Sequence, residues 1–279
     1  MTDWLEAGNG VVITGGASGI GLAAATHFAG AGLNVLLADL SEEALGAAAE
    51  TLDGLPGTVH AQVCDVADFE QVQRLAEIAA DKLGAVRCLM NNAGTGFPPC
   101  APWEKLDVWK RQIEINQWGI VHGCQAFIPG MLAGGLTGAV INTGSKQGIT
   151  NPPGNYAYNL SKAGVKAYTE SVAHALRQID NCQLSAHLLV PGFTYTGMIS
   201  RFVPEQPPGA WSPAQVVEFM LTSLTRGDFY ILCPDNDTPR ALDERRIQWN
   251  TDDLLQNRSA LSRWDPAYAA AYEAFIDDA

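Results

Sequence analysis

A chain of 279 residues is long enough for one large α/β domain or two small domains, and a composition that is 47% apolar and 17% charged can supply a sizeable core. Its 17 Lys and Arg against 30 Asp and Glu give a net charge of −13, with no cluster of basic residues to neutralise phosphates. We therefore expect an acidic soluble protein without a nucleic-acid partner.

The six cysteines are widely spaced, with no C-x-x-C pair and no neighbouring histidine cluster. This pattern predicts reduced thiols in a cytoplasmic protein and no metal site. The segment 1–10 lacks the basic and apolar regions of a signal peptide. The stretch 115–145 has no charged residue, but Pro129 and Gly134-Gly135 interrupt it. It is therefore expected to form a buried helix, a turn and a buried strand and not a membrane span.

The first predicted element is a short β-branched strand at 11–13, which runs into the glycine-rich sequence 14–21, TGGASGIG. A run of small residues typical of a helix follows. Glycines permit a tight turn and a close approach by a ligand, and a helix N-terminus offers free N–H groups to an anion. The pattern indicates a phosphate-binding turn, although a tight loop without a ligand is the alternative.

The second predicted strand, 34–39, ends in Asp39, about 20 residues after the glycines. A carboxylate at this position can accept hydrogen bonds from the hydroxyls of an adenosine ribose. The next residue is Leu40, and no adjacent Arg or Lys is available for a 2′-phosphate. The sequence therefore favours NAD over NADP.

Helices and strands continue to alternate along the chain. Ser41 is a predicted helix cap for 41–53, a strand follows at 59–64, an amphipathic helix at 68–83, and a fourth strand at 87–90. Such alternation predicts a parallel sheet with helices on both faces and ligands at the carboxyl ends of the strands. No repeat or linker divides 10–232, so we expect one domain there.

Ser145 stands at the end of the next apolar run, and Tyr158 and Lys162 follow four residues apart. Residues i and i+4 share one face of a helix, so the phenol and the ammonium could point into one site. A nearby positive charge favours the phenolate and would lower the tyrosine pKa from its usual value near 10. Tyr156 is the less suitable tyrosine, because its i+4 residue is Leu160.

Together, the glycine sequence 14–21, Asn91-Asn92-Ala93-Gly94, Ser145, Tyr158-x-x-x-Lys162 and Pro191-Gly192 resemble the short-chain dehydrogenase/reductase family over about residues 10–232. The resemblance implies a doubly wound Rossmann fold with a mostly parallel seven-stranded sheet. The Gly-x-x-x-Gly-x-Gly spacing resembles the compact, single-domain branch and not the extended branch that modifies nucleotide sugars.

The resemblance also implies roles for individual residues. The catalytic set would be Asn116, Ser145, Tyr158 and Lys162, with Asn116 holding a water near the lysine; a buried amide that satisfies backbone groups is the alternative for Asn116. Residues implied to bind the cofactor are Gly15, Ser18, Gly19, Ile20, Asp39, Leu40, Asp65, Val66, Asn92, Ala93, Gly94, Tyr158, Lys162, Pro191, Gly192, Thr194 and Thr196. At Thr194 the family usually has Val or Ile.

The implied activity is NAD-dependent interconversion of a secondary alcohol and a ketone, with Tyr158 as general acid/base. The implied assembly is a homodimer or homotetramer built through the helices at 115–131 and 158–176. One alternative is an NAD-binding sensor without chemistry, which the complete catalytic set disfavours. The other is a nucleotide-sugar epimerase or dehydratase, which the glycine spacing disfavours.

The segment 193–211 is apolar and aromatic, which predicts a hydrophobic, aromatic or alicyclic substrate. The candidate substrate contacts are Gln147, Phe193, Tyr195 and Trp211, with Met198, Ile199, Phe202, Phe97 and Trp118 as further apolar residues. Alternatively, several of these rings pack the loop against the core. Lys146 is expected to reach solvent and not a substrate acid.

From residue 235 the composition becomes charged and aromatic. Helical spacing at 240–255 and 266–276 predicts two helices in this region. We therefore expect a single catalytic domain at 1–234, with its substrate loop at about 193–211, and a helical extension at 235–279. The extension would pack on the same domain or on a neighbouring subunit.

Overall fold

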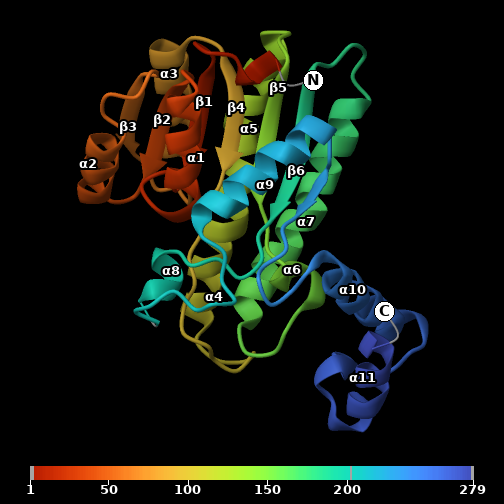
Figure 1. Cartoon of the computed structure of the whole chain (residues 1–279). Helices are drawn as coiled ribbons and strands as arrows, with labels where there is room; N and C mark the ends of the chain where they lie inside the picture. The colour runs from red at the N-terminus through yellow and green to blue at the C-terminus, as the bar shows by residue number, and fades with distance from the viewer. Residues whose placement is uncertain (1–2, 202, 278–279) are drawn as a thin grey trace.

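The computed structural model describes residues 3–201 and 203–277 and contains one seven-stranded parallel sheet with helices on both faces (Figure 1). The strand order is β3-β2-β1-β4-β5-β6-β7, with every neighbouring pair parallel. The strands are β1 (Gly10–Thr14), β2 (Asn34–Asp39), β3 (Val59–Val63), β4 (Val86–Asn91), β5 (Gly138–Thr143), β6 (Leu184–Val190) and β7 (Tyr230–Leu232). The predicted doubly wound Rossmann fold is confirmed.

Side chains of the central strands alternate between two buried layers, as the two-residue period of a strand requires. Val11 and Ile13 of β1 belong to one core cluster, and Val12 between them belongs to the other. This is why the central strands are continuously apolar: both faces are covered.

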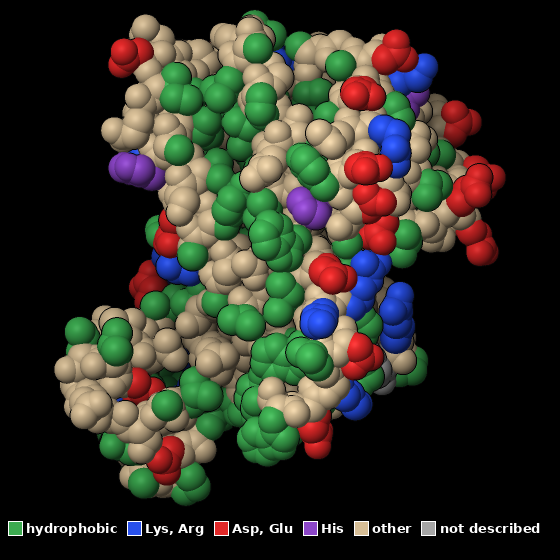
Figure 2. Space-filling view, turned by 180° about the vertical axis from the view of Figure 1, so that it is seen from behind, with side chains coloured by type: hydrophobic (Ala, Val, Ile, Leu, Met, Phe, Trp, Pro, Cys, Tyr) green, Lys and Arg blue, Asp and Glu red, His purple; other side chains and the backbone are tan. Residues whose placement is uncertain are grey.

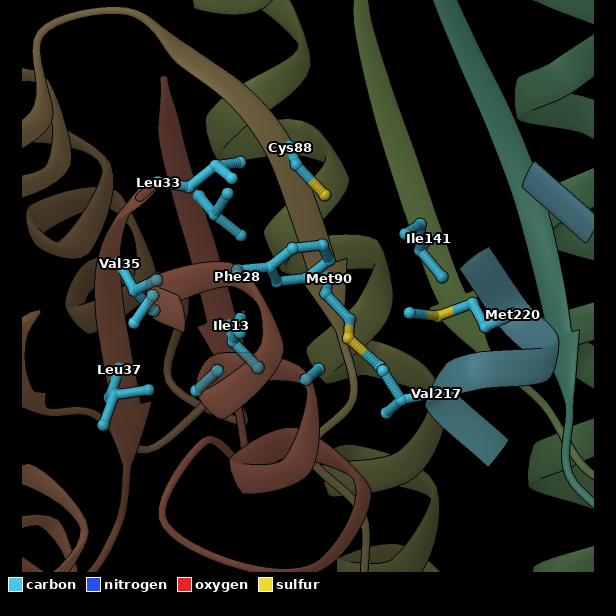
Figure 3. Packing of buried hydrophobic residues seen from close by; sticks show 14 of the residues in the cluster. Ile13, Phe28, Leu33, Val35, Leu37, Cys88, Met90, Ile141, Val217 and Met220 are labelled. Carbon is cyan, nitrogen blue, oxygen red and sulfur yellow. The ribbon is translucent and has the colours of Figure 1, made fainter. Parts of the chain in front are cut away.

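The first layer packs under α1 (Gly19–Gly30), α2 (Glu42–Thr51) and α9 (Pro213–Arg226). Figure 3 shows Phe28 of α1 beside Met90 of β4, with Val217 and Met220 of α9 nearby. Ser41 caps α2, as predicted, by accepting a hydrogen bond from the Ala44 N–H.

The second layer packs under α3 (Phe69–Leu83), α5 (Gly119–Ala133) and α7 (Tyr156–Arg177). The uncharged stretch forms a helix, a turn and the strand β5, as predicted. Before α5 lie α4 (Leu106–Ile113) and a π-helical turn at Glu114–Trp118. No helix in the described part of the chain is both long and apolar enough to cross a membrane.

Short helices lie at the carboxyl end of the sheet: α6 (Gln147–Thr150) follows β5, and α8 (Gly197–Ser200) follows β6. A 3-10 turn at Asp3–Leu5 precedes β1. Because the carboxyl ends of the parallel strands meet here, residues that are distant in sequence are brought to one edge of the sheet.

The C-terminal segment contains α10 (Arg240–Leu255), 3-10 turns at Ser262–Trp264 and Pro266–Tyr268, and α11 (Ala269–Asp277). It lies next to α6 at the carboxyl end of the sheet (Figure 1), and Figure 2 shows it as a lobe that stands off from the main body. Its own small core places the Trp249 ring 5.3 Å from that of Tyr272 and 5.2 Å from that of Phe275.

Candidate functional site

A cavity of about 800 Å³ opens at the carboxyl ends of the strands, where ligands bind in open α/β sheets. Its walls come from the glycine turn after β1, from the residues that follow β2 to β6, and from α7. Predicted residues that line it are Gly15, Ser18, Gly19, Ile20, Asp39, Leu40, Asp65, Val66, Asn92, Ala93, Gly94, Ser145, Gln147, Tyr158, Lys162, Pro191, Gly192, Phe193, Thr194 and Thr196.

The turn after β1 needs its glycines for both conformation and space. Gly15 and Gly19 have φ of +63° and +53°, in the left-handed region that other residues rarely adopt. A Cβ on Gly21 would lie 2.2 Å from the Gly15 carbonyl oxygen. The Asn92 side chain donates to the same carbonyl at 3.2 Å and thereby holds the turn against β4. The N-terminus of α1 is thus presented to the cavity.

Asp39 ends β2 with its carboxylate already oriented. One oxygen accepts a hydrogen bond from the Ala17 N–H at 3.1 Å and the other from the Leu40 N–H at 2.8 Å. Leu40 is 62% exposed and lines the cavity beside it. A carboxylate held by two backbone amides retains lone pairs for further hydrogen bonds.

Asp65, after β3, is also constrained. Its carboxylate forms an ion pair with Arg111 of α4 at 2.8 Å and accepts from the Ala67 N–H at 3.0 Å. Arg111 itself lines the cavity and was not predicted. It lies on α4, 46 residues from Asp65 in the sequence, so only the fold reveals that the two are close.

Three of the four polar side chains expected to carry the chemistry line the cavity. Ser145 follows β5, Tyr158 and Lys162 share one face of α7, and the Ser145 side chain is near enough to Tyr158 to lower the pKa of its phenol. The Lys162 ammonium donates to the Thr143 carbonyl at 2.7 Å and lies 5.8 Å from the centre of the Tyr158 ring. The geometry therefore brings a phenol, a hydroxyl and a buried cation together.

The predicted effect of Lys162 on Tyr158 needs correction. Burial raises the pKa of the Tyr158 phenol, and the hydrogen bond with Ser145 opposes that rise only in part. Burial also lowers the pKa of Lys162 to about 8, which weakens the cation's ability to favour a phenolate. Burial is therefore the dominant influence on the pKa of both groups.

Because the unfolded chain retains the Lys162 proton up to a pKa of 10.5 and the folded chain only up to about 8, the unfolded state binds more protons between these values. This residue therefore makes the fold more stable as pH rises through that window. Relative to a Lys162→Met variant, the wild-type free energy of unfolding should increase by about 2 kcal/mol between pH 7 and pH 10. Urea titrations of both proteins measure the difference, and a difference independent of pH would contradict the expectation.

Asn116 is placed behind the cavity wall. It is fully buried in the π-helical turn, where its amide donates to the Thr95 carbonyl at 2.9 Å and accepts from the Thr95 N–H at 2.8 Å. The structure therefore matches the alternative of a buried amide that satisfies backbone groups. It nevertheless lies near the lysine, since a Cβ on Gly94 would be 3.4 Å from the Asn116 oxygen and 3.7 Å from the Lys162 ammonium. Such π-turns occur frequently at functional sites.

Two of the candidate substrate contacts are not on the cavity wall. The Tyr195 hydroxyl donates to the Pro204 carbonyl at 2.6 Å and so ties its loop together. Trp211 packs against the core beside Phe219, with ring centres 5.9 Å apart. For these two residues, packing of the loop is the correct interpretation, because both rings find partners away from the cavity.

The other apolar candidates divide between cavity and surface. Phe97, Met198 and Ile199 line the cavity, whereas Trp118 is 51% exposed and lies beside His122. Phe202 lies outside the described residues. The part of the cavity wall expected to contact the substrate is therefore still apolar.

Lys146 is mostly buried and ion-paired, whereas a solvent-exposed side chain was expected. Its ammonium lies 2.6 Å from the Asp243 carboxylate and 3.1 Å from that of Asp235, and its side chain is only 17% exposed. Asp243 lies on α10, and Asp235 lies in the segment after β7. Because both are distant from residue 146 in the sequence, residue spacing could not predict these ion pairs.

Further lining residues that the sequence did not single out come mostly from the irregular segment after β4 and from the edges of the motifs. These are Cys64, Thr95, Gly96, Pro98, Pro99, Arg111, Ile115, Thr143, Gly144, Asn155, Gly197 and Arg201. The Pro98-Pro99 pair after a strand end was the one available signal for an ordered, non-helical segment at this edge.

Comparison with known proteins agrees with this geometry. Residues 9–207 match the family model described as short chain dehydrogenase. The chain is 32% identical to 1-deoxy-11-beta-hydroxypentalenate dehydrogenase of Streptomyces exfoliatus, over 85% of this chain and 87% of that protein. It is also 32% identical to 3beta-hydroxysteroid dehydrogenase 2 of Eggerthella lenta, over 69% of this chain and 73% of that protein.

Among solved structures, a short chain dehydrogenase/reductase from Burkholderia phymatum in complex with NAD is similar, with a TM-score of 0.83 and 29% identity. The match covers 91% of this chain and 96% of that one. The extent of these matches, together with the strand order and the cavity, shows that this chain belongs to the short chain dehydrogenase family, whose members are oxidoreductases that bind a nicotinamide cofactor.

Proposed function

We propose that this protein is an NAD-dependent oxidoreductase that interconverts a secondary alcohol and a ketone. The observation that carries the proposal is the meeting of Ser145, Tyr158 and Lys162 in a cavity that also holds Asp39, with β1 and β4 between the strand that ends in Asp39 and the strand that precedes Ser145. The part of the cavity near Asp39 can therefore bind a nucleotide, while the part near Tyr158 can exchange a proton with a substrate.

The residues present fit a dinucleotide. Side chains on Gly15 and Gly21 would collide with the backbone, and Gly19 has a positive φ. This cradle exposes the N-terminus of α1, which suits a pyrophosphate. The oriented Asp39 carboxylate suits ribose hydroxyls, and it would repel a 2′-phosphate. NAD is the preferred cofactor on this basis, and when bound it supplies the hydride-transfer chemistry.

Remaining contacts proposed for the cofactor come from the loops after β3, β4 and β6. Asp65 and Val66 would contact the adenine, and Asn92, Ala93 and Gly94 pass beneath the nucleoside. Pro191, Gly192, Thr194 and Thr196 would flank the nicotinamide, with backbone amides available where Thr194 replaces the usual aliphatic residue.

The proposed proton chemistry belongs to Tyr158. Its hydroxyl and that of Ser145 would hold the substrate oxygen, and Tyr158 would donate the proton to a ketone or accept it from an alcohol. Lys162 uses one ammonium hydrogen on the Thr143 carbonyl, which leaves two donors for the cofactor ribose and the tyrosine side. Asn116 would act by holding the backbone of Thr95 in place near Lys162.

The substrate is proposed to be hydrophobic, aromatic or alicyclic. Phe97, Phe193, Met198 and Ile199 make the substrate end of the cavity apolar. Within the described residues the buried Gln147 amide oxygen has no hydrogen-bond partner, so it is available to a hydroxyl or other donor on the substrate.

A panel of secondary alcohols with NAD, and of the corresponding ketones with NADH, tests this function. We expect alicyclic and aromatic compounds to be turned over with kcat/KM at least about tenfold above that of short polyols, because the latter leave the apolar wall uncovered. Nicotinamide absorbance at 340 nm measures the rate. Activity confined to short polyols would contradict the substrate class, and absence of any turnover would contradict the reaction.

The catalytic domain is proposed to span residues 1–234, with 235–279 as an extension, and to assemble as a homodimer or homotetramer. Large apolar side chains are exposed on the two segments expected to pair: Trp118 and Leu160 are each 51% exposed. A second copy of the chain would remove this surface from water.

A further inference from the structure

A buried three-charge cluster joins parts of the chain that are distant in sequence. Lys146, directly after Ser145, lies between Asp235, which follows β7, and Asp243 on α10. The Lys146 side chain is 17% exposed and each aspartate side chain 6%. Buried charges of this kind are costly to separate, because removing one partner leaves the others desolvated and unpaired. The cluster is therefore expected to keep its three segments at fixed separations.

One side of the cluster holds the loop after β6. Asp235 accepts a hydrogen bond from the Phe193 N–H at 3.0 Å, and Phe193 is among the residues that line the cavity. A Cβ on Gly192 would lie 2.6 Å from the Asp235 carboxylate and 2.9 Å from the Lys146 ammonium. The backbone at 192–193 is thus packed directly on the ion pairs.

The other side holds α6, which carries Gln147. Besides the Asp243 ion pair, the Asn250 side chain of α10 donates to the Ile149 carbonyl at 3.3 Å. Ile149 and Ile247 both pack against the second core cluster. The extension is therefore anchored along α6 by an ion pair, a hydrogen bond and apolar contact.

We propose that Lys146 is a positioning residue through which the C-terminal extension sets the geometry of the substrate end of the cavity. It holds Ser145 and Gln147 on one side and Phe193 on the other at the separation that the substrate requires. This inference rests on the proposed alcohol–ketone oxidoreductase function. Direct contact between Lys146 and the substrate is the competing role, because Lys146 is also among the residues that line the cavity. Asp243 is absent from the described cavity wall, so it separates the two roles.

The first test replaces the cation. Lys146→Met should raise KM for the best substrate of the panel about tenfold or more, while one equivalent of ADP-ribose still binds within about threefold of the wild-type affinity. The affinity for ADP-ribose shows whether the nucleotide-binding part of the cavity is intact, and the number of equivalents bound gives the fraction of the protein that is folded. Lys146→Arg, which keeps the charge, should recover most of the loss. The matched control is Lys82→Met, because Lys82 forms an exposed ion pair with Asp81 on α3, away from the cavity; it should remain within twofold of wild type.

The second test leaves Lys146 in place and uses two neighbouring carboxylates of α10. Asp243→Asn should raise KM severalfold and speed hydrogen exchange in segment 191–199, whereas Glu244→Gln should change neither, since Glu244 forms an exposed ion pair with Arg240. If Lys146→Met fails to bind ADP-ribose, that variant is not folded. The comparison of Asp243→Asn with Glu244→Gln then decides whether the proposal holds. Equal KM values and equal exchange in those two variants would overturn the proposal. A wild-type protein that binds ADP-ribose but turns over no panel substrate would instead overturn the proposed function.

Discussion

Replacing Tyr158 by phenylalanine is expected to lower kcat by about 10²- to 10⁴-fold while the NADH dissociation constant stays within about threefold. The substitution removes only the hydroxyl that would exchange a proton with the substrate, and the ring that fills the buried site remains. Steady-state kinetics and fluorescence titration of NADH measure the two quantities separately.

Tyr156→Phe is the matched control, since Tyr156 starts the same helix and is absent from the described cavity wall. It should retain kcat within about twofold. Near-wild-type turnover in Tyr158→Phe would remove Tyr158 from the mechanism. An equal loss in both variants would indicate damage to the start of α7 instead of loss of an acid/base group.

Replacing Asp39 by alanine is expected to raise the NADH dissociation constant about 100-fold and to reduce the preference for NADH over NADPH. Hydrogen bonds to a charged group contribute about 1.5–3 kcal/mol each, and about 1.4 kcal/mol corresponds to a tenfold change in affinity. The variant also loses the repulsion between a carboxylate and a 2′-phosphate, so NADPH should suffer less than NADH. Binding titrations with both cofactors measure the ratio.

Asp81→Ala controls for the loss of a carboxylate, because Asp81 is an exposed residue whose side chain is 72% accessible and pairs with Lys82. It should bind both cofactors as the wild type does. A wild-type protein that binds NADPH as tightly as NADH would refute the proposed cofactor preference. If Asp39→Ala weakens the binding of NADH and of NADPH equally, the role of Asp39 is limited to holding the backbone at Ala17 and Leu40.

Several secondary-structure elements could be predicted almost to the residue because their signals are local. The strand 34–39 coincides with β2, and the helix 240–255 coincides with α10. Apolar runs of strand length and helix caps are encoded in contiguous residues. The helix start at Asp68 was recognisable for the same reason, since its side chain accepts from the Gln71 N–H.

The π-helical turn around Asn116 could not be read from the sequence. Its extra residue per turn has no compositional signature, and the turn forms where the Asn116 amide binds both backbone groups of Thr95. Likewise, the direction in which a ring points in a loop depends on distant partners. Phe193 and Tyr195 stand two residues apart, yet one lines the cavity and the other binds the Pro204 carbonyl.

By itself the sequence determined the alternation of strands and helices, the glycine turn, and the placement of Asp39, Ser145, Tyr158 and Lys162 at strand ends or on one helical face. These follow from backbone propensity and from the periods of helix and strand. Only the tertiary structure decided the burial that raises the pKa of Tyr158 and lowers that of Lys162. It alone paired Lys146 with Asp235 and Asp243, because desolvation and ion pairing depend on which segments are brought together in space.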